Sequence, residues 1–453
     1  MNISRERRWF GTDGIRARVG EPPLTPEFVL RLAWSAARVL NHGEGGGIAV
    51  VGKDTRRSGY MYESALEAGF SAAGMDIRLL GPIPTPAVAY ITRTFRASLG
   101  VVISASHNPY QDNGIKFFGP DGRKLDDDTE YAIEQTLESE HLVADPERIG
   151  RAKRVEDARG RYIEFCKASV PHGLSLSGLK LVIDCAHGAT YAVAEHVFSD
   201  LGAEVVLIGA EPNGFNINVG CGSTCPEHVA QAVKTHDADY GLAFDGDGDR
   251  VVMVDGSGRI FDGDDLLYVI ATDRAARGAL SGAVVGTVMS NIGLEMALNA
   301  HDIGFDRTHV GDRHVLARLR EVGGLVGGES SGHIVCLDSS TTGDGIIAGL
   351  AVLAAVVTRQ KSLAEICEPF VKHPQVLENV AIDGVARETV LADTGLHKLV
   401  EDIERKLGSS GRVLLRPSGT EALIRVMVEG PDEDAIREYA KQISRAVTRA
   451  AQR

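Results

Sequence analysis

Ser106 stands in a polar turn that directly follows a short apolar run. The run, Val101-Val102-Ile103, consists of β-branched residues and predicts a buried strand. It ends in Ser, His, Asn and Pro, which favour turns over regular ladders. Open α/β sheets bind their ligands just beyond the carboxyl ends of their strands. Ser106 is therefore expected to face a cleft from a rigid support, although a turn without chemistry explains this stretch alone equally well.

Three aspartates, Asp245, Asp247 and Asp249, alternate with two glycines between two expected strands, 240–244 and 251–254. Glycine tolerates the backbone angles that such a tightly curled loop needs. Carboxylates this close repel one another unless a cation lies among them, and a set of oxygen ligands suits Mg²⁺ or Ca²⁺. The spacing is that of an EF-hand start, but the flanking segments are strands. A solvated acidic turn is the weaker alternative.

Two later stretches offer groups that bind sugars and phosphate. The first runs from Glu329 to His333 and combines an acid, two hydroxyls and an imidazole, which hydrogen-bond sugar hydroxyls and, at the histidine, carry protons near neutral pH. The alternative for it is a turn with a satisfied histidine. The second has two arginines, two hydroxyls and a glycine-supported run of N–H groups, which together fit a phosphate cradle: Arg416, Ser418, Gly419, Thr420 and Arg425.

Alternating strands and helices precede Ser106, which is the pattern of a layered α/β unit. The first helix is expected to begin with Thr25 as its N-cap and Pro26 at its first position. After Ser106, the dipeptide Asn113-Gly114 is a strong hairpin signal, and Lys116 lies one strand-like step beyond it. A lysine there suits a transferring phosphoryl group, and a solvent-facing lysine is the alternative. Further along, residues 181–188 weakly repeat residues 101–108, as if one unit had been duplicated.

Composition limits the class of protein. A chain of 453 residues is too long for one core, and its 43% hydrophobic and 24% charged residues are typical of a globular protein in water. No stretch approaches the ~20 apolar residues of a membrane span, and the charged start does not resemble a signal peptide. The six scattered cysteines predict reduced thiols in the cytoplasm. A net charge of −14 argues against nucleic acid and membrane partners.

The Ser106 turn and the aspartate loop together resemble the α-D-phosphohexomutase superfamily, and the resemblance covers almost the whole chain. It implies three similar α/β domains and a smaller α+β C-terminal domain around a central cleft, with expected bounds 1–160, 161–258, 259–373 and 374–453. It also implies roles for single residues. Ser106 would carry a phosphoryl group and, with the three aspartates, bind one Mg²⁺ per chain. Glu329, Ser331 and His333 would read the sugar, and the cradle around Arg416 the distal phosphate. Further catalytic residues would be Lys116, Arg16, Arg250 and His333.

The implied reaction moves phosphate within a hexose phosphate through a bisphosphorylated sugar, with a sugar 1,6-bisphosphate as activator. Residues 10–19, 22–40, 311–313 and 341–345 are most similar to the branch that acts on glucosamine phosphates. The expected reaction is therefore the interconversion of glucosamine 6-phosphate and glucosamine 1-phosphate, which feeds UDP-N-acetylglucosamine and cell-wall synthesis. Alternatives are a phosphoglucomutase or phosphomannomutase, a metal-dependent phosphatase and a non-catalytic phosphosugar-binding protein. A homodimer is the assembly considered.

Overall fold

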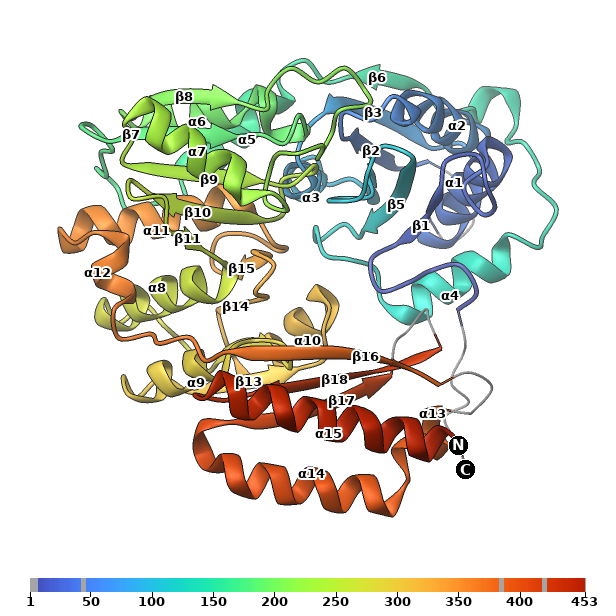
Figure 1. The fold of residues 1–453 in the computed structure, drawn as a ribbon. Helices are drawn as coiled ribbons and strands as arrows, with labels where there is room; N and C mark the ends of the chain where they lie inside the picture. The colour runs from blue at the N-terminus through green and yellow to red at the C-terminus, as the bar shows by residue number, and fades with distance from the viewer. Residues whose placement is uncertain (1–6, 42–45, 383–386, 418–421, 453) are drawn as a thin grey trace. The chain divides into compact units, whose positions relative to one another are not determined.

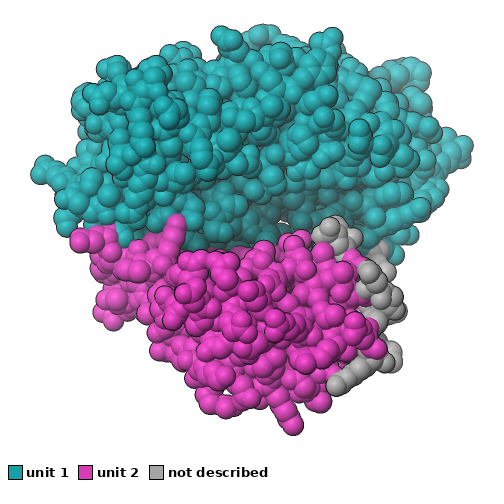
Figure 2. Space-filling model, in the orientation of Figure 1, with its two compact units in different colours: residues 1–287, 304–367 teal, residues 288–303, 368–453 magenta. Residues whose placement is uncertain are grey.

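The computed structural model describes residues 7–41, 46–382, 387–417 and 422–452. Over these residues the strands form four sheets (Figure 1). The chain divides into two compact units, shown in separate colours in Figure 2. Unit 1 comprises Met1–Thr287 and Gly304–Cys367, and unit 2 comprises Val288–Ile303 and Glu368–Arg453. The four expected domain bounds stay a prediction, since this division is coarser.

The first sheet carries the Ser106 turn. Its strand order is β1-β5-β4-β2-β3-β6, and β5 runs antiparallel to both of its neighbours while β4, β2, β3 and β6 are parallel. The strands are β1 (Ile15–Arg18), β2 (Ile48–Lys53), β3 (Asp76–Pro82), β4 (Leu99–Ile103), β5 (Asp112–Phe118) and β6 (Ala152–Arg154). The accompanying helices are α1 (Pro26–Leu40), α2 (Ser58–Ala72), α3 (Thr85–Thr94) and α4 (Asp127–Thr136).

Local signals set the start of α1 as predicted. The Thr25 hydroxyl accepts a hydrogen bond from the amide of Phe28 (3.3 Å), and Pro26 occupies the first helical position, where its missing N–H costs nothing. Apolar residues of α1, α2 and the strands then form one buried cluster under the sheet, which includes Leu32, Phe70 and Val101. This core makes the sheet a rigid base for the turn after β4.

The predicted hairpin at Asn113-Gly114 is wrong. Both residues lie inside β5, where they pair with Ala17 and Arg16 of β1. A Cβ on Gly114 would come within 2.6 Å of the Ser104 carbonyl oxygen, so this glycine serves a close approach of two backbones. The β4–β5 connection is the Ser106 turn itself.

The second and third sheets repeat the mixed layout. The second has the order β11-β10-β9-β7-β8 and the third β13-β12-β14-β15. Their strands are β7 (Lys180–Asp184), β8 (Glu204–Ile208), β9 (Tyr240–Phe244), β10 (Val251–Asp255), β11 (Ile260–Phe261), β12 (Val284–Thr287), β13 (Phe305–Thr308), β14 (Val326–Gly328) and β15 (Ile334–Cys336). Their helices are α5 (Ala158–Lys167), α6 (Ala194–Asp200), α7 (Pro226–His236), α8 (Gly263–Ala276), α10 (Asp312–Val322), α11 (Gly345–Arg359) and α12 (Leu363–Cys367).

Unit 2 is built on an antiparallel sheet of order β16-β18-β17 with helices, which confirms the α+β class expected for the C-terminal region. Its elements are β16 (Gln375–Ala381), β17 (Arg412–Pro417), β18 (Leu423–Glu429), α9 (Ile292–Asn299), α13 (Arg387–Leu391), α14 (Thr394–Leu407) and α15 (Glu433–Ala451). The buried carboxylate of Glu429 joins α9 to the sheet, because it accepts hydrogen bonds from the Ile292 amide (2.8 Å) and Arg412 Nε (2.6 Å).

Two findings concern the predictions about membrane spans and about reduced cysteines. In the part of the chain that the structure describes, no helix is both long and apolar enough to cross a membrane. All six cysteines are free thiols.

Candidate active site

The Ser106 turn joins β4 to β5 and holds its serine in a left-handed conformation, with φ of 51°. This region is unfavourable for residues other than glycine and is found most often where the surroundings impose it. The Ser106 amide donates to Ser104 Oγ (2.9 Å), and the Asn108 amide donates to the Ala105 carbonyl (3.1 Å). The serine side chain is 1% exposed. A buried hydroxyl is thus held at a strand end in a fixed direction.

The three aspartates lie directly opposite Ser106, in the connection between the antiparallel strands β9 and β10. Ser106 Oγ donates to Asp245 Oδ2 at 2.5 Å. The carboxylates of Asp245, Asp247 and Asp249 are all buried and have oxygen atoms within 4.8 Å of one another. Among the described residues, Asp247 Oδ1 and Asp249 Oδ1 have no hydrogen-bond partner. Buried carboxylate oxygens without a hydrogen bond, in an all-oxygen set, fit a hard divalent cation such as Mg²⁺.

The pKa values of the three aspartates in this loop are shifted in different directions. Burial raises the pKa of Asp245 well above its usual range, and the nearby Asp249 and Asp247 raise it further. Burial acts on the pKa of Asp247 and Asp249 in the same direction, but Lys116 lowers both below their usual range. Lys116 therefore favours the ionised form of two carboxylates of the loop, and an added cation would favour the ionised form of the third.

Lys116 reaches this loop from β5. Its Nζ lies 2.8 Å from Asp247 Oδ2, 3.0 Å from Asp13 Oδ2 and 3.6 Å from Asp249 Oδ2. Burial alone would lower the pKa of Lys116, but these three carboxylates raise it above its usual value. Lys116 is therefore a buried positive charge at the aspartate loop that Ser106 contacts, and the solvent-facing alternative does not hold.

A histidine contacts the Ser106 hydroxyl, and two arginines lie near that histidine. Arg16, in β1, pairs with Asp13, and Arg250 Nε lies 3.9 Å from Asp249 Oδ1. His107 Nδ1 lies 3.3 Å from Ser106 Oγ. Burial, followed by the charges of Arg250 and Arg16, lowers the pKa of His107 to about 4, so the imidazole is neutral at pH 7. Positive charge from these arginines suits an anionic group on Ser106.

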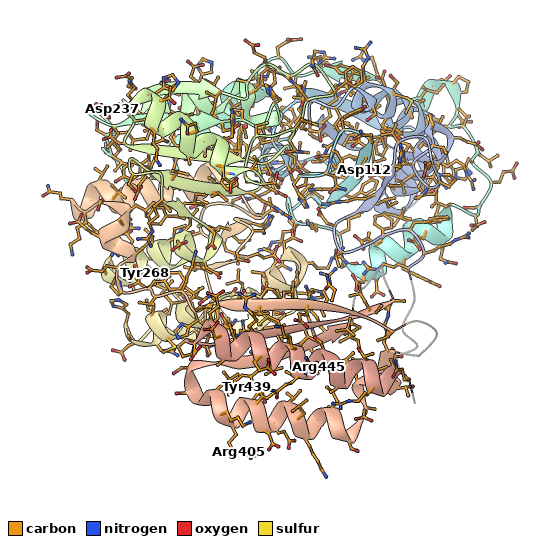
Figure 3. All side chains as sticks on the ribbon, viewed as in Figure 1. Asp112, Asp237, Tyr268, Arg405, Tyr439 and Arg445 are labelled. Carbon is orange, nitrogen blue, oxygen red and sulfur yellow. The ribbon has the colours of Figure 1, made fainter. Side chains whose placement is uncertain are left out.

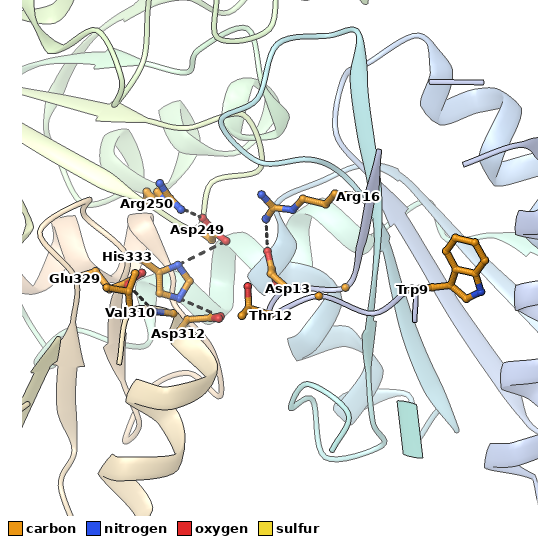
Figure 4. Close-up of a pocket in the computed structure, with 13 residues that line it drawn as sticks. Trp9, Thr12, Asp13, Arg16, Asp249, Arg250, Val310, Asp312, Glu329 and His333 are labelled. Carbon is orange, nitrogen blue, oxygen red and sulfur yellow. Dashed lines mark hydrogen bonds and ion pairs between the residues drawn. The ribbon is translucent and has the colours of Figure 1, made fainter. Parts of the chain in front are cut away.

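A pocket of about 370 Å³ opens beside these groups within unit 1 (Figure 4). Its lining includes Asp13 and Arg16 on one side and, on the other, Asp249, Arg250, Asp312, Glu329 and His333. Glu329 and His333 come from the β14–β15 connection, where Glu329 Oε1 accepts from the Gly311 amide (2.9 Å). Ser331 is exposed and is not among the described residues that line the pocket.

Six charged side chains form a closed ring of alternating sign at the pocket. Three bases alternate with three acids, and each contact links two neighbours: Asp13, Lys116, Asp249, His333, Asp312 and Lys124. The imidazole lies 3.6 Å from Asp249 and from Asp312. Burial alone would lower the pKa of His333, but Asp249 and then Asp312 raise it to about 9. His333 therefore carries a positive charge at neutral pH.

A glycine allows His333 to lie where it does. A Cβ on Gly343 would come within 2.2 Å of the His333 Nε2 atom, so any side chain there would displace the imidazole. This is the physical reason for a glycine in the segment before α11.

The expected phosphate cradle lies in unit 2. Arg416 of β17 and Arg425 of β18 are directly paired across the two strands. Like charges in such a pair repel, and burial together with Arg425 lowers the pKa of Arg416. Two cations held this close suit a bound anion. Ser418, Gly419 and Thr420 lie outside the described residues.

Several residues of the site had no prediction attached to them. Asp13 and Asp312 stood in stretches that the sequence singled out, and an acid beside a predicted arginine was the available signal. Lys124 offered no signal, because its partners are distant in sequence. Thr85, which donates from Oγ1 to Asp247 Oδ2 (2.6 Å), is likewise identified only by the fold.

Four domain models of one family match the chain in succession. The phosphoglucomutase/phosphomannomutase alpha/beta/alpha domains I, II and III match residues 7–144, 160–258 and 262–373, and the C-terminal domain of that family matches residues 357–446. The chain therefore belongs to the phosphoglucomutase/phosphomannomutase family, and the predicted superfamily and fold class are confirmed.

Curated relatives of high identity are named after one activity within this family. The phosphoglucosamine mutase of Thioalkalivibrio sulfidiphilus is 58% identical over 447 residues, which are 98% of this chain and 99% of that protein. The phosphoglucosamine mutase of Halorhodospira halophila is 58% identical over 450 residues, or 99% of this chain and 98% of the relative.

Solved structures share the fold at lower identity. A phosphoglucomutase/phosphomannomutase family protein from Burkholderia thailandensis superimposes with a TM-score of 0.79 at 22% identity and covers 97% of both chains. The Aspergillus fumigatus N-acetylphosphoglucosamine mutase, solved with GlcNAc-6P and magnesium, has a TM-score of 0.67 at 17% identity and covers 98% of this chain and 96% of its own.

Proposed function

We propose that the chain interconverts glucosamine 6-phosphate and glucosamine 1-phosphate by carrying a phosphoryl group on Ser106. The observation that carries this proposal is the buried Ser106 hydroxyl, held against Asp245 beside three carboxylates, one lysine and two arginines. The curated relatives at 58% identity, which are phosphoglucosamine mutases, support the choice of substrate.

The chemistry is in-line phosphoryl transfer, in which positioning and electrostatic stabilisation do most of the work. Phosphorylated Ser106 gives its phosphoryl group to the free hydroxyl of the sugar monophosphate, and the resulting bisphosphate returns its other phosphate to Ser106 Oγ. Lys116, Arg16 and Arg250 stabilise the negative charge of the group in transit. A phosphoserine adds about −1.5 to −2 charges at this point, which these cations offset.

Asp245, Asp247, Asp249 and Ser106 would hold one Mg²⁺. When bound, the cation neutralises charge on the transferring phosphoryl group and makes a phosphoserine tolerable beside three carboxylates. The Oδ1 atoms of Asp247 and Asp249, which have no hydrogen-bond partner among the described residues, support this assignment. The aspartates themselves fix the direction of Ser106 Oγ and hold Lys116.

The sugar is read by Glu329, Ser331 and His333 in the proposed reaction. Glu329 and His333 line the pocket, and the charge of His333 suits it for donating to a sugar or phosphate oxygen. Arg416 and Arg425, with Ser418, Gly419 and Thr420, would hold the phosphate that is not reacting. A sugar 1,6-bisphosphate would serve as activator. We place the enzyme in the cytoplasm, and a homodimer stays a prediction of the sequence.

The substrate is tested by comparing three 1-phosphates, those of glucosamine, glucose and mannose, under the same Mg²⁺ and bisphosphate concentrations. The highest kcat/KM is expected for glucosamine 1-phosphate, because the ammonium at C2 finds an acidic pocket that includes Glu329 and Asp312. Equal or higher values for glucose or mannose 1-phosphate would assign the chain to a phosphoglucomutase or phosphomannomutase activity instead.

The carrier is tested by mass spectrometry of the purified chain after incubation with glucose 1,6-bisphosphate. A single added phosphate on Ser106 is expected. A chain that binds the sugar but takes no phosphate would be a phosphosugar-binding protein, and one that only releases inorganic phosphate would be a phosphatase.

A further inference from the structure

We propose that Asn218 is a positioning residue for the reaction: its amide holds the turn that aims Ser106. The proposal rests on the proposed function of Ser106 as phosphoryl carrier. Asn218 lies in the connection between β8 and α7, far from the serine in sequence and outside the stretches that predicted chemistry.

The side-chain amide of Asn218 binds the serine turn at two points. Its Nδ2 donates to the carbonyl oxygen of Ser106 (2.9 Å) and to that of Asn108 (3.0 Å). The buried guanidinium of Arg56, from the segment after β2, donates to the same two carbonyls. The turn is thus held by two donors. Arg56 follows a strand of the same sheet as the turn, and Asn218 follows a strand of the second sheet.

The turn needs such support because Ser106 is left-handed, with φ of 51°. A non-glycine residue in this region is unfavourable and persists only where its surroundings impose the conformation. Asn218 is itself left-handed, with φ of 61°, and its amide N–H donates to the carbonyl of Ala186 (2.9 Å). Ala186 also has a positive φ, of 52°. Three strained residues are therefore joined by hydrogen bonds that end on the serine.

The two hydrogen bonds from Asn218 Nδ2 lie where the serine turn meets the aspartate loop. A Cβ on Gly246, between two of the aspartates, would come within 2.7 Å of the Ser106 carbonyl oxygen and 2.8 Å of Asn218 Nδ2. With its carbonyl fixed here, Ser106 directs Oγ at Asp245, 2.5 Å away. Release of the carbonyl would let the turn rotate, and a misplacement of about 1 Å can cost on the order of 10²-fold in rate.

The test variant is Asn218→Gly. Glycine adopts φ of 61° without strain, so the substitution removes the amide and leaves the backbone conformation accessible. The matched control is Asp237→Gly, which changes another left-handed residue, with φ of 50°, at the exposed C-terminal end of α7 (Figure 3). A second variant, Asn218→Asp, keeps the shape but turns a donor toward two carbonyl oxygens into an acceptor.

Turnover of glucosamine 1-phosphate is measured for all four proteins, together with the rate at which glucose 1,6-bisphosphate phosphorylates Ser106. Asn218→Gly is expected to lower kcat roughly 10- to 100-fold, since two hydrogen bonds are lost, with KM unchanged. The phosphorylation rate should fall in parallel, and Asn218→Asp should lose at least as much. The control should match the wild type in both rates, and all four proteins should stay folded at the temperature of the assay.

Two results would overturn the inference. One is a wild-type kcat in Asn218→Gly, and the other is a loss that appears in KM or in the unfolding temperature rather than in kcat and the phosphorylation rate. Failure of the proposed function looks different, because the wild-type chain itself would then take no phosphate. If the wild type is phosphorylated but prefers another sugar phosphate, the same comparison is made with that substrate.

Discussion

The chain makes the same turn twice, once after β4 and once after β7. At the first, Ser104 Oγ accepts from the Ser106 amide, and at the second, Asp184 Oδ1 accepts from the Ala186 amide, both at 2.9 Å. The third residue of each turn is left-handed, with φ of 51° at Ser106 and 52° at Ala186. A histidine follows in both. The weak repeat that the sequence showed between these stretches is therefore a repeat of backbone geometry up to the left-handed residue, after which His187 is also left-handed (φ of 49°) and His107 is not.

The two turns contact the aspartate loop differently. Ser106 presents its hydroxyl to Asp245, whereas the second turn packs against Gly246 through backbone, with the Ala189 amide donating to the Gly246 carbonyl (2.8 Å). His107 points at the serine hydroxyl, while His187 Nδ1 accepts from the Glu211 amide (3.2 Å). The turn conformation by itself therefore only positions its residues. The first turn differs from the second because its serine hydroxyl faces the carboxylates.

Ser106→Ala makes the first turn chemically like the second and is expected to have the largest effect. Mutase activity should fall about 10³-fold or more, because the carrier oxygen is lost. The thermal unfolding temperature should stay near the wild-type value, since φ and the Ser104 contact are kept. Activity is measured with glucosamine 1-phosphate and bisphosphate activator. Substantial residual turnover would point to another carrier, with Ser104 the nearest candidate.

Metal removal tests the three aspartate carboxylates, one of which accepts a side-chain hydroxyl from the first turn, whereas the second turn has alanine at that position. EDTA should abolish turnover and Mg²⁺ should restore it, and Asp247→Asn should lower kcat about 10²-fold or more, since several kcal/mol of charge stabilisation are lost. Isothermal titration with Mg²⁺ should show one site in the wild type and weakened binding in the variant. A chelated enzyme that retains its rate would remove the cation from the proposal.

Asp184→Ala tests the support of the second turn. The buried Asp184 carboxylate accepts from the Ala186 amide, the Gly222 amide (2.8 Å) and His228 Nδ1 (2.8 Å). Its removal should lower the free energy of unfolding by about 3–5 kcal/mol, because buried donors lose a charged partner. Ser104→Ala, the equivalent change in the first turn, should cost about 1 kcal/mol. Urea unfolding of both variants measures the difference, and equal losses would show that the supports are equivalent.

Ala186→Ser gives the second turn a hydroxyl at the position of Ser106 and should have the smallest effect on activity. Among the described residues, the one carboxylate group that could hold a metal receives the Ser106 hydroxyl, so the double variant Ser106→Ala with Ala186→Ser should take no phosphate from glucose 1,6-bisphosphate, as judged by intact mass. The single variant should keep mutase activity near the wild-type level, with overpacking costing about 1–3 kcal/mol of stability. Phosphate found on residue 186 would show that turn geometry alone is sufficient.

The sequence predicted those parts of the site that are contiguous in the chain. The strand before Ser106, the aspartate loop between two strands and the cap at Thr25 all depend on near neighbours, and all are present. Asn113-Gly114 was misread because pairing of β5 on both sides overrides a local turn preference. The roles of Asn218 and Lys124 could not be predicted, since their partners lie about a hundred or more residues away and only the fold brings them together.

The contact between Glu429 and Ile292 has a consequence for the order in which the chain is made. Residues 288–303 belong to the same compact unit as 368–453, although the residues between them belong to the other unit. On the ribosome, α9 emerges long before β18, so the Ile292 amide lacks its partner until the last charged group of the sheet, the Glu429 carboxylate, has been synthesised. Earlier sheets can close in the meantime, because N-terminal parts of a chain generally fold first. A nascent chain stopped before residue 429 therefore carries an unfinished early segment as well as an unfinished end.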